Sequence, residues 1–340
     1  MFNKRTLFIV GAGASAEVDF PVGAQLARNI GAKMDIRFER GFDPVGTGDH
    51  DLYSHITHSR RQEADQFQPA AWRIRDGISF AQSIDDFLDQ HRNDRYVNLY
   101  GKAAIVQAIV EAERNSRLFF NRHEGVETFD AERLADTWFV KFMYMLCRGI
   151  PKENVAELFG NVAFVVFNYD RCIEHFLINA LQRSYAIGLQ EAASIVDDLD
   201  IFHPYGLVGN LRQVPFGSTR INCVALAGSI KTYTEQIAAA DTQTRLVGMC
   251  ANAEHIVFLG FAYHNQNMAL LRPASEFPAA KKVFGTAYGM SDSDVEVVGH
   301  QIDAWFKGRN ARTYRSGMIK LENKLKCAGL FDNYARSLAG

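Results

Sequence analysis

Residues 6–15 read TLFIVGAGAS, and the rest of the chain can be interpreted outward from them. The run from Thr6 to Val10 is mostly apolar, and it stops at Gly11 and Gly13, before a segment that can start a helix. This order predicts a strand, a tight loop and a helix. Glycine in such a loop lets an anion approach the backbone, while N–H groups and the positive end of the helix dipole face the anion. The stretch therefore predicts a phosphate-binding loop.

The composition of the 340-residue chain narrows the class of protein. With 47% hydrophobic residues, the chain can bury a large core without disulfides or a structural metal. Its five cysteines form no CxxC pair, which is typical of a reducing cytosol and gives no zinc ribbon. The net charge of -2 gives no basic field for nucleic acid, and no apolar stretch is long enough for a membrane span. We expect a cytoplasmic protein without a metal, a membrane contact or direct nucleic-acid binding.

Further apolar runs predict the other strands of a sheet. They lie at residues 162–167, 201–202, 224–227, 256–259 and 283–284. The run at 162–167 is continuously apolar, which suits a central parallel strand covered on both faces. Helical periodicity lies between most of these runs. The pattern predicts an α/β fold with a doubly wound, Rossmann-like parallel sheet of about six strands and a helical insertion.

The spacing of apolar residues also predicts the domain organisation. Residues 22–34 carry an apolar stripe at four-residue spacing, which predicts a helix packed on the first strand. The segment 37–69 is polar and aperiodic, and we expect a long loop that is a candidate lid. Helical patterns follow from 84 to 145. The predicted units are a nucleotide-binding domain of residues 1–35 and 155–310, an inserted helical subdomain of residues 36–154, and a helical C-terminal extension of residues 311–340.

Polar residues follow two of the predicted strands. Asn168 and Asp170 come directly after the run 162–167, and His203 follows the run 201–202. Because the carboxyl ends of parallel strands meet at one edge of a sheet, these side chains are expected to share a crevice with the glycine loop. Strand alternation would place His203 and Tyr205 on the same side. The alternatives are that Asn168 or Asp170 caps the next helix and that His203 is a buried, hydrogen-bonded core residue.

Together these motifs resemble the sirtuin-like NAD-hydrolysing (NADase) domains of bacterial anti-phage defence systems, over nearly the whole chain. The matching segments are GAGAS at 11–15 for the phosphate loop, FNYD at 167–170 for the Asn-x-Asp element, HPYG at 203–206 for the catalytic histidine segment, LGF at 259–261 and FGT at 284–286 for the later glycine turns, and SIDDFL at 83–88 with GKA at 101–103 for the helical insertion. The four-cysteine zinc module of sirtuin deacylases is absent, and Tyr205 stands where sirtuins place histidine before glycine.

The resemblance implies that NAD is a substrate and that the bond between nicotinamide and ribose is cleaved. The products would be nicotinamide and ADP-ribose, in linear or cyclic form. By this resemblance Asn168 orients the water or the ribose, Asp170 holds the carboxamide or the ribose, and His203 accepts a proton. The pyrophosphate would be held by Gly11, Ala12, Gly13 and Ser15, and the adenosine half would be lined by Gly260, Phe261, Gly285 and Thr286.

The resemblance also implies a cellular role and partners. Such domains deplete NAD in abortive infection, act as homo-oligomers, and often work with a partner ATPase, translocase or sensor chain. This chain has no GxxxxGK[ST] motif, so an ATPase would be a separate chain. Four other functions stay open: a sirtuin-type protein deacylase, a non-catalytic NAD or ADP-ribose sensor, a nuclease suggested by Arg60-Arg61 and Lys320–Lys326, and a hydride-transfer enzyme in which Asp35 would bind the ribose.

Overall fold

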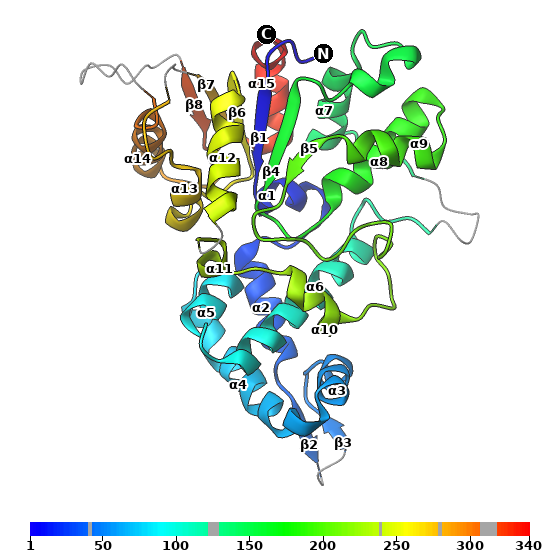
Figure 1. The fold of residues 1–340 in the computed structure, drawn as a ribbon, viewed down its shortest axis with the longest axis vertical. Coiled ribbons are helices and arrows are strands. Elements are labelled where there is room, and N and C mark those ends of the chain that lie inside the picture. Colours follow the sequence, from blue (N-terminus) through cyan, green and yellow to red (C-terminus); the bar gives the residue numbers. More distant parts are fainter. Residues whose placement is uncertain (40–42, 122–128, 238–239, 278–280, 307–317) are drawn as a thin grey trace.

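Six parallel strands form the central sheet, in the order β5-β4-β1-β6-β7-β8 (Figure 1). The computed structural model describes residues 1–39, 43–121, 129–237, 240–277, 281–306 and 318–340. The strands are β1 (Thr6–Val10), β4 (Val162–Val166), β5 (Asp200–Phe202), β6 (His255–Leu259), β7 (Lys282–Thr286) and β8 (Ile319–Glu322). Numbered along the chain, the strand order is 3-2-1-4-5-6, the doubly wound Rossmann order. The predicted fold class is confirmed, and the strand order reverses between β1 and β6.

Strand β1 is the centre of the core. It pairs in parallel with β4 on one side and β6 on the other, and all five of its residues are buried. Phe8 stacks on Phe164 of β4 with ring centroids 5.1 Å apart. A strand covered on both faces needs apolar side chains at successive positions, which explains why the run from Thr6 to Val10 does not alternate with polar residues.

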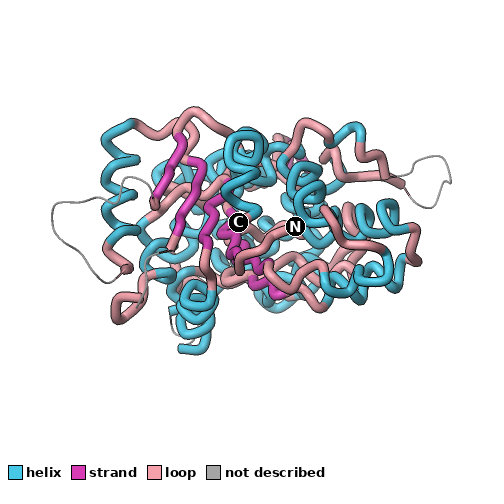
Figure 2. The backbone as a smooth tube through the Cα atoms, turned by 90° about the horizontal axis from the view of Figure 1, so that it is seen from above, coloured by secondary structure: helices cyan, strands magenta, loops and turns pink. Residues whose placement is uncertain are grey.

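Helices cover both faces of the sheet, as the view from above shows (Figure 2). Helices α7 (Trp138–Cys147), α8 (Cys172–Tyr185) and α15 (Cys327–Ala339) pack together, and Phe142 and Phe331 contact Phe8. The strands of the second half are joined through α12 (Ala240–Asn252), α13 (Asn265–Leu271) and α14 (Asp292–Asp303). Right-handed crossovers in opposite directions from β1 place the two sets on opposite faces. The N–H of Asn3 donates to the carbonyl of Ala339, which joins the two ends of the chain.

A helical lobe extends below the C-terminal ends of the strands (Figure 1). It consists of α2 (Gly23–Lys33), the hairpin β2 (Arg37–Glu39) and β3 (Asp43–Val45), α3 (His50–Ser59), α4 (Phe67–Gly77), α5 (Ile84–Gln90), α6 (Arg95–Asn115), α10 (Cys223–Leu226) and α11 (Tyr233–Ile237). Helix α6 contacts α2, α4, α5 and α10. The chain therefore enters this lobe twice, before β4 and again after β5. Short helices α1 (Ala12–Ser15) and α9 (Leu189–Asp197) belong to the sheet domain.

A buried ion pair joins the helical lobe to the sheet domain. The guanidinium of Arg171, before α8, donates to both carboxylate oxygens of Glu113 on α6, at 2.9 and 2.6 Å. The side chains are 1% and 0% exposed. Burial raises the pKa of Glu113, although Arg171 and the N–H of Gly217 oppose that effect. This buried ion pair therefore connects helix α6 of the helical lobe to the start of α8 in the sheet domain.

Two strand predictions are wrong. Residues 224–227 lie in helix α10 and the helical turn after it, where the Asn222 side chain accepts a hydrogen bond from the N–H of Ala225. Four apolar residues are too few to distinguish a helix from a strand. The sixth strand is instead β8, inside the predicted helical extension 311–340, whose residues 311–317 lie outside the described chain. Its side chains alternate, as expected for an edge strand with one covered face.

Two packing predictions also fail. Helix α2 packs on α6 and α4 of the helical lobe rather than on β1, and α7, within the predicted insertion, covers the sheet. The segment 37–69 is not a long loop, because it folds into the hairpin β2–β3, α3 and the start of α4, with residues 40–42 outside the described chain. Leu52, Ile56 and Phe67 are buried there. Its many polar residues concealed a sparse apolar stripe.

Candidate active site

A cavity of about 930 Å³ lies at the C-terminal ends of β1, β4, β6 and β7. Helix α5 and the turn before it close the side toward the helical lobe. Residues from five segments line it: 11–23 after β1, 80–86 before and in α5, Phe167 and Asn168 after β4, 260–267 after β6, and 286–290 after β7. Tyr205, Lys326 and Cys327 complete the lining. In a doubly wound sheet this is the switch point at which ligands bind.

The glycines of the first loop allow it to cross the loop after β6. A Cβ atom would lie 2.6 Å from the Gly260 carbonyl oxygen if built on Gly11, and 2.9 Å from it if built on Gly13. On Gly260, which has φ +57°, a Cβ would lie 2.0 Å from the nitrogen of Ala14. The loops after β1 and β6 therefore touch through their backbones, and side chains at these glycines would push the two loops apart. The cavity lining at this contact includes Gly11, Ala12 and Gly13.

This crossing changes the expected anion site. The N–H of Gly11 donates to Leu259 and the N–H of Gly13 donates to Gly260, at 2.9 and 3.0 Å. Helix α1 is a single turn, so its dipole is small. The N–H groups of Gly11 and Gly13 are therefore paired within the protein, and phosphate binding by this loop stays a prediction.

Asn168 belongs to a buried polar chain. Its Nδ2 donates to Ser15 Oγ at 3.2 Å, and Ser15 Oγ donates to Asp170 Oδ2 at 2.8 Å. Asp170 Oδ1 accepts the N–H of Cys172 at 3.1 Å, so the capping alternative holds for Asp170. Burial raises the pKa of Asp170, and the hydrogen bonds from Cys172 and Ser15 oppose it. Of the three linked side chains Ser15, Asn168 and Asp170, the described cavity wall includes only Asn168.

His203 lies behind Asn168. Its Nδ1 is 3.2 Å from the carbonyl oxygen of Asn168 and its Nε2 is 2.9 Å from Glu174 Oε1, so both ring nitrogens have partners. Burial alone would lower the pKa of His203, but the Glu174 carboxylate, the Asn168 carbonyl and Asp170 together outweigh burial, and the pKa is raised. His203 is not among the described residues that line the cavity.

Tyr205 lines the cavity instead, and its hydroxyl donates to Asn267 Oδ1 at 2.6 Å. The expectation that His203 and Tyr205 face the same side is wrong. Strand β5 ends at Phe202, and the turn through Pro204 no longer alternates.

The turns after β6 and β7 support each other. Thr286 Oγ1 accepts the N–H of Gly260 at 2.8 Å, and both residues line the cavity together with Phe261. Gly285 is set back from the described lining. A Cβ on Gly285 would lie 2.5 Å from the Tyr263 hydroxyl, which donates to the Thr286 carbonyl at 3.1 Å. Gly285 therefore leaves room for the tyrosine that holds Thr286.

Asp85 lines the cavity, although the sequence motifs do not predict it as a site residue. It lies in the first turn of α5, half-buried in the cavity wall, and the Tyr169 hydroxyl donates to its Oδ1. Burial, with smaller effects from Asp86 and Asp89, raises the pKa of Asp85 to about 7. A carboxyl group with this pKa in a cavity is typical of proton-transfer sites. Two features of the sequence could have pointed to Asp85. Asp85 and Asp86 follow Ser83, which can cap a helix, and Tyr169 lies between the predicted site residues Asn168 and Asp170.

A basic and aromatic pair marks another part of the wall. Lys326 precedes α15, and its Nζ lies 5.5 Å from the ring centroid of Tyr288, which is 61% exposed. Lys326 is the single Lys or Arg among the described residues of the lining. Glu17 accepts the N–H groups of Trp138 and Ala328, at the starts of α7 and α15. Burial raises the pKa of Glu17.

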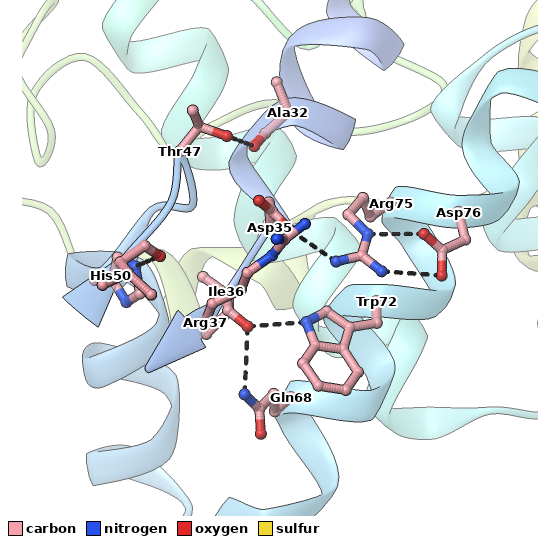
Figure 3. A network of polar contacts seen from close by, with 11 residues as sticks. Ala32, Asp35, Ile36, Arg37, Thr47, His50, Gln68, Trp72, Arg75 and Asp76 are labelled. Atoms are coloured by element: carbon pink, nitrogen blue, oxygen red, sulfur yellow. Dashed lines mark hydrogen bonds and ion pairs between the residues drawn. The ribbon is translucent and has the colours of Figure 1, made fainter. Parts of the chain in front are cut away.

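Asp35 and the segment after it lie away from the cavity. Asp35 Oδ1 accepts hydrogen bonds from Arg37 at 2.8 Å and from Arg75 at 2.7 Å (Figure 3). The Arg75 hydrogen bond lowers the pKa of Asp35. Trp72 Nε1 donates to the Ile36 carbonyl at 2.9 Å, which fixes the chain beyond α2 (Figure 3). Asp35 is thus engaged within the helical lobe. In the described chain, no part of segment 37–69 lines the cavity, and a role of this segment as a lid stays a prediction.

Comparisons of the chain with protein-family models and with curated proteins give no match. Within the described ranges, no group of three or more His, Cys, Asp or Glu side chains could hold a metal ion. No helix in the described part of the chain is both long enough and apolar enough to span a membrane.

Proposed function

We propose that the chain is an NAD⁺ hydrolase that cleaves the bond between nicotinamide and ribose to give nicotinamide and ADP-ribose. The observation that carries the proposal is the cavity of about 930 Å³ at the switch point of a 3-2-1-4-5-6 sheet. Dinucleotides bind at this place in such sheets, and the volume suits a ligand of that size. The resemblance to sirtuin-like NADase domains supports the same substrate.

The cavity wall has groups suited to the parts of a dinucleotide. Lys326 supplies a positive charge for the pyrophosphate, and the exposed ring of Tyr288 offers a face on which a base can stack. The Gly11–Gly13 backbone gives a surface without side chains beyond Ala12. Phe261 and Thr286 would line the adenosine half.

The chemistry needs little from an acid. Nicotinamide is cationic while it is attached to ribose and leaves as a neutral molecule, so the protein does not have to protonate it. The enzyme must hold the ribose as it becomes oxocarbenium-like, exclude bulk water and position one water molecule. Asn168 suits this task, because Ser15 fixes its Nδ2 and leaves its amide oxygen to accept from a ribose hydroxyl or a water.

His203 and Asp170 act in this proposal as positioning residues. His203 contacts the backbone of Asn168, and Asp170 orients the Ser15 hydroxyl that holds the Asn168 side chain. Both lie behind the cavity wall, so the roles first expected of them in contact with NAD pass to residues that line it.

The cellular role in the proposal is NAD depletion as an effector of anti-phage defence. It rests on the resemblance, which also supports a homo-oligomer and a partner ATPase, translocase or sensor chain that activates it. An NADase without such control would drain the NAD of its own cell.

The test is product analysis with a matched pair of variants. The purified chain is incubated with NAD, with and without the product of a neighbouring gene, and products are identified by mass spectrometry. We expect nicotinamide and ADP-ribose from the wild type and from Asn154→Ala, a surface control, and none above background from Asn168→Ala. Full turnover by a folded Asn168→Ala variant would contradict the proposal.

One observation favours a second function, a non-catalytic NAD or ADP-ribose sensor. Tyr205 occupies the cavity wall where sirtuins place histidine, and both nitrogens of His203 are engaged. Tight ADP-ribose binding without any NAD turnover would support the sensor instead of the hydrolase.

A further inference from the structure

Asp85 lies in the cavity wall beside two other carboxylates and accepts a hydrogen bond from Tyr169. It lies on α5, which belongs to the helical lobe, but its Oδ1 accepts the hydroxyl of Tyr169 from the loop after β4. Burial and the neighbouring carboxylates Asp86 and Asp89 raise the pKa of Asp85, and its own backbone N–H opposes them. Among the described residues Asp85 makes no ion pair, and it faces the cavity as a partly desolvated acid.

The other acids of the described cavity wall are already engaged. Glu17 accepts two backbone N–H groups at helix starts. Asp86 accepts the N–H of Gln82 and the side chain of Gln90. His264 also lines the cavity, but burial lowers its pKa, which makes it a weaker base than a free histidine. Asp85 remains as the lining carboxylate whose known partner, Tyr169, donates to its charged form.

Two neighbours show that Asp85 is close to the groups that would surround the ribose. Tyr169 directly follows Asn168 in the chain, so its hydrogen bond brings Asp85 to the end of β4. Asp85 also contributes, after burial, to the raised pKa of Tyr205. The rings of Tyr169 and Tyr205 lie 6.5 Å apart.

We propose that Asp85 is the proton acceptor of the reaction, taking a proton from the water that attacks the ribose. The inference rests on the proposed NAD hydrolysis. The bond between C1′ and the pyridinium nitrogen breaks, and its electron pair stays on nicotinamide, which leaves neutral. The water oxygen bonds to C1′, and the proton it loses goes to the Asp85 carboxylate. Tyr169 is a positioning residue that holds the carboxylate in its charged form.

The pKa of Asp85 suits this role, since a base whose pKa lies near 7 is partly ionised at neutral pH and still accepts a proton well. The titratable groups around it are Asp86 and Asp89 on its own helix, Tyr169 and Tyr205 from the sheet loops, His264 beside Asp86, Tyr233 on α11, and the ion pair of Lys102 on α6 with Glu235 on α11.

The experiment compares full-length wild type, Asp85→Asn and Asp198→Asn. Asp198 is exposed at the end of α9, outside the described cavity wall, and serves as the control. Asp85→Asn should lower kcat for NAD by roughly 10²–10⁴-fold, the usual contribution of a general base. ADP-ribose affinity, measured by calorimetry, should stay within about threefold. Asp198→Asn should stay close to wild type.

Azide gives a readout that a structural role would not move. Azide attacks C1′ without losing a proton, so sodium azide should restore nicotinamide release by Asp85→Asn and yield the azido sugar. Tyr169→Phe should raise the pH at which kcat is half-maximal, because the hydrogen bond to the charged carboxylate is lost.

The outcomes separate this inference from the proposed function. If Asp85→Asn turns over NAD as fast as wild type, or if azide does not restore the activity that the variant loses, Asp85 is not the proton acceptor. Hydrolysis of NAD by the wild type would still support the proposed function. Loss of activity in His264→Gln with full activity in Asp85→Asn moves the base to His264. Absence of turnover in the wild type removes the proposed function and this inference together.

Discussion

Replacing Asp85 with asparagine should stabilise the protein at alkaline pH, although it removes a hydrogen-bonded carboxylate. The folded protein raises the pKa of Asp85 from 3.8 to about 7. Between these values the unfolded chain releases its proton and the folded chain keeps it, so wild-type stability falls as the pH rises from about 4 to 7 and stays low above 7. Asparagine has no proton to release, and its amide oxygen can still accept from Tyr169.

The size of the effect follows from the difference in pKa. A difference of about 3, at ~1.4 kcal/mol for each, sets an upper limit of ~4 kcal/mol. Because Asp85 is half-buried, water screens part of this, and we expect a gain of about 2 kcal/mol at pH 8 and under ~1 kcal/mol at pH 5.

The assay is urea unfolding of wild type, Asp85→Asn and the exposed control Asp198→Asn at pH 5 and pH 8. The account predicts a gain for Asp85→Asn that grows with pH, and little change for the control. An equal gain at both pH values, or a variant less stable than wild type at pH 8, would refute the reasoning.

Two further predictions concern the frame of the site. Gly260→Ala should abolish ADP-ribose binding measured by calorimetry and lower thermal stability, because its Cβ would lie 2.0 Å from the nitrogen of Ala14. The control is Gly149→Ala, because Gly149 has a similar φ of +78° and nothing within 4 Å of its Cβ position. This control should cost only about 1 kcal/mol of stability, and it separates the effect of the clash from that of backbone strain. Arg171→Met should cost about 3–5 kcal/mol in urea unfolding because it leaves Glu113 buried without its partner, and adding Glu113→Gln should recover part of that; a single variant as stable as wild type would show that the ion pair is not needed.

Much of the sheet could be predicted from local sequence. The runs Thr6–Val10 and 162–167 are apolar at successive positions because two layers of helices cover them, and this burial is visible in the sequence. The run 224–227 misled because a short apolar stretch has no period, and β8 was missed because its alternation lies among charged residues.

The site was only partly predictable, because its contacts are made between distant segments. Asn168 was expected in the crevice and lines it, but whether His203 or Tyr205 faces the cavity depends on the turn through Pro204. Asp85 and Tyr169 are 84 residues apart in the sequence, and no residue near Asp85 in the chain predicts their hydrogen bond.

The most direct test of the central claim is a crystal structure of Asn168→Ala grown with NAD. The account predicts an intact dinucleotide in the cavity at the strand ends, with its pyrophosphate beside Ala12 and its nicotinamide ribose between residue 168 and Asp85. NAD bound at another surface, or a cavity that stays free of dinucleotide at saturating NAD, would contradict it.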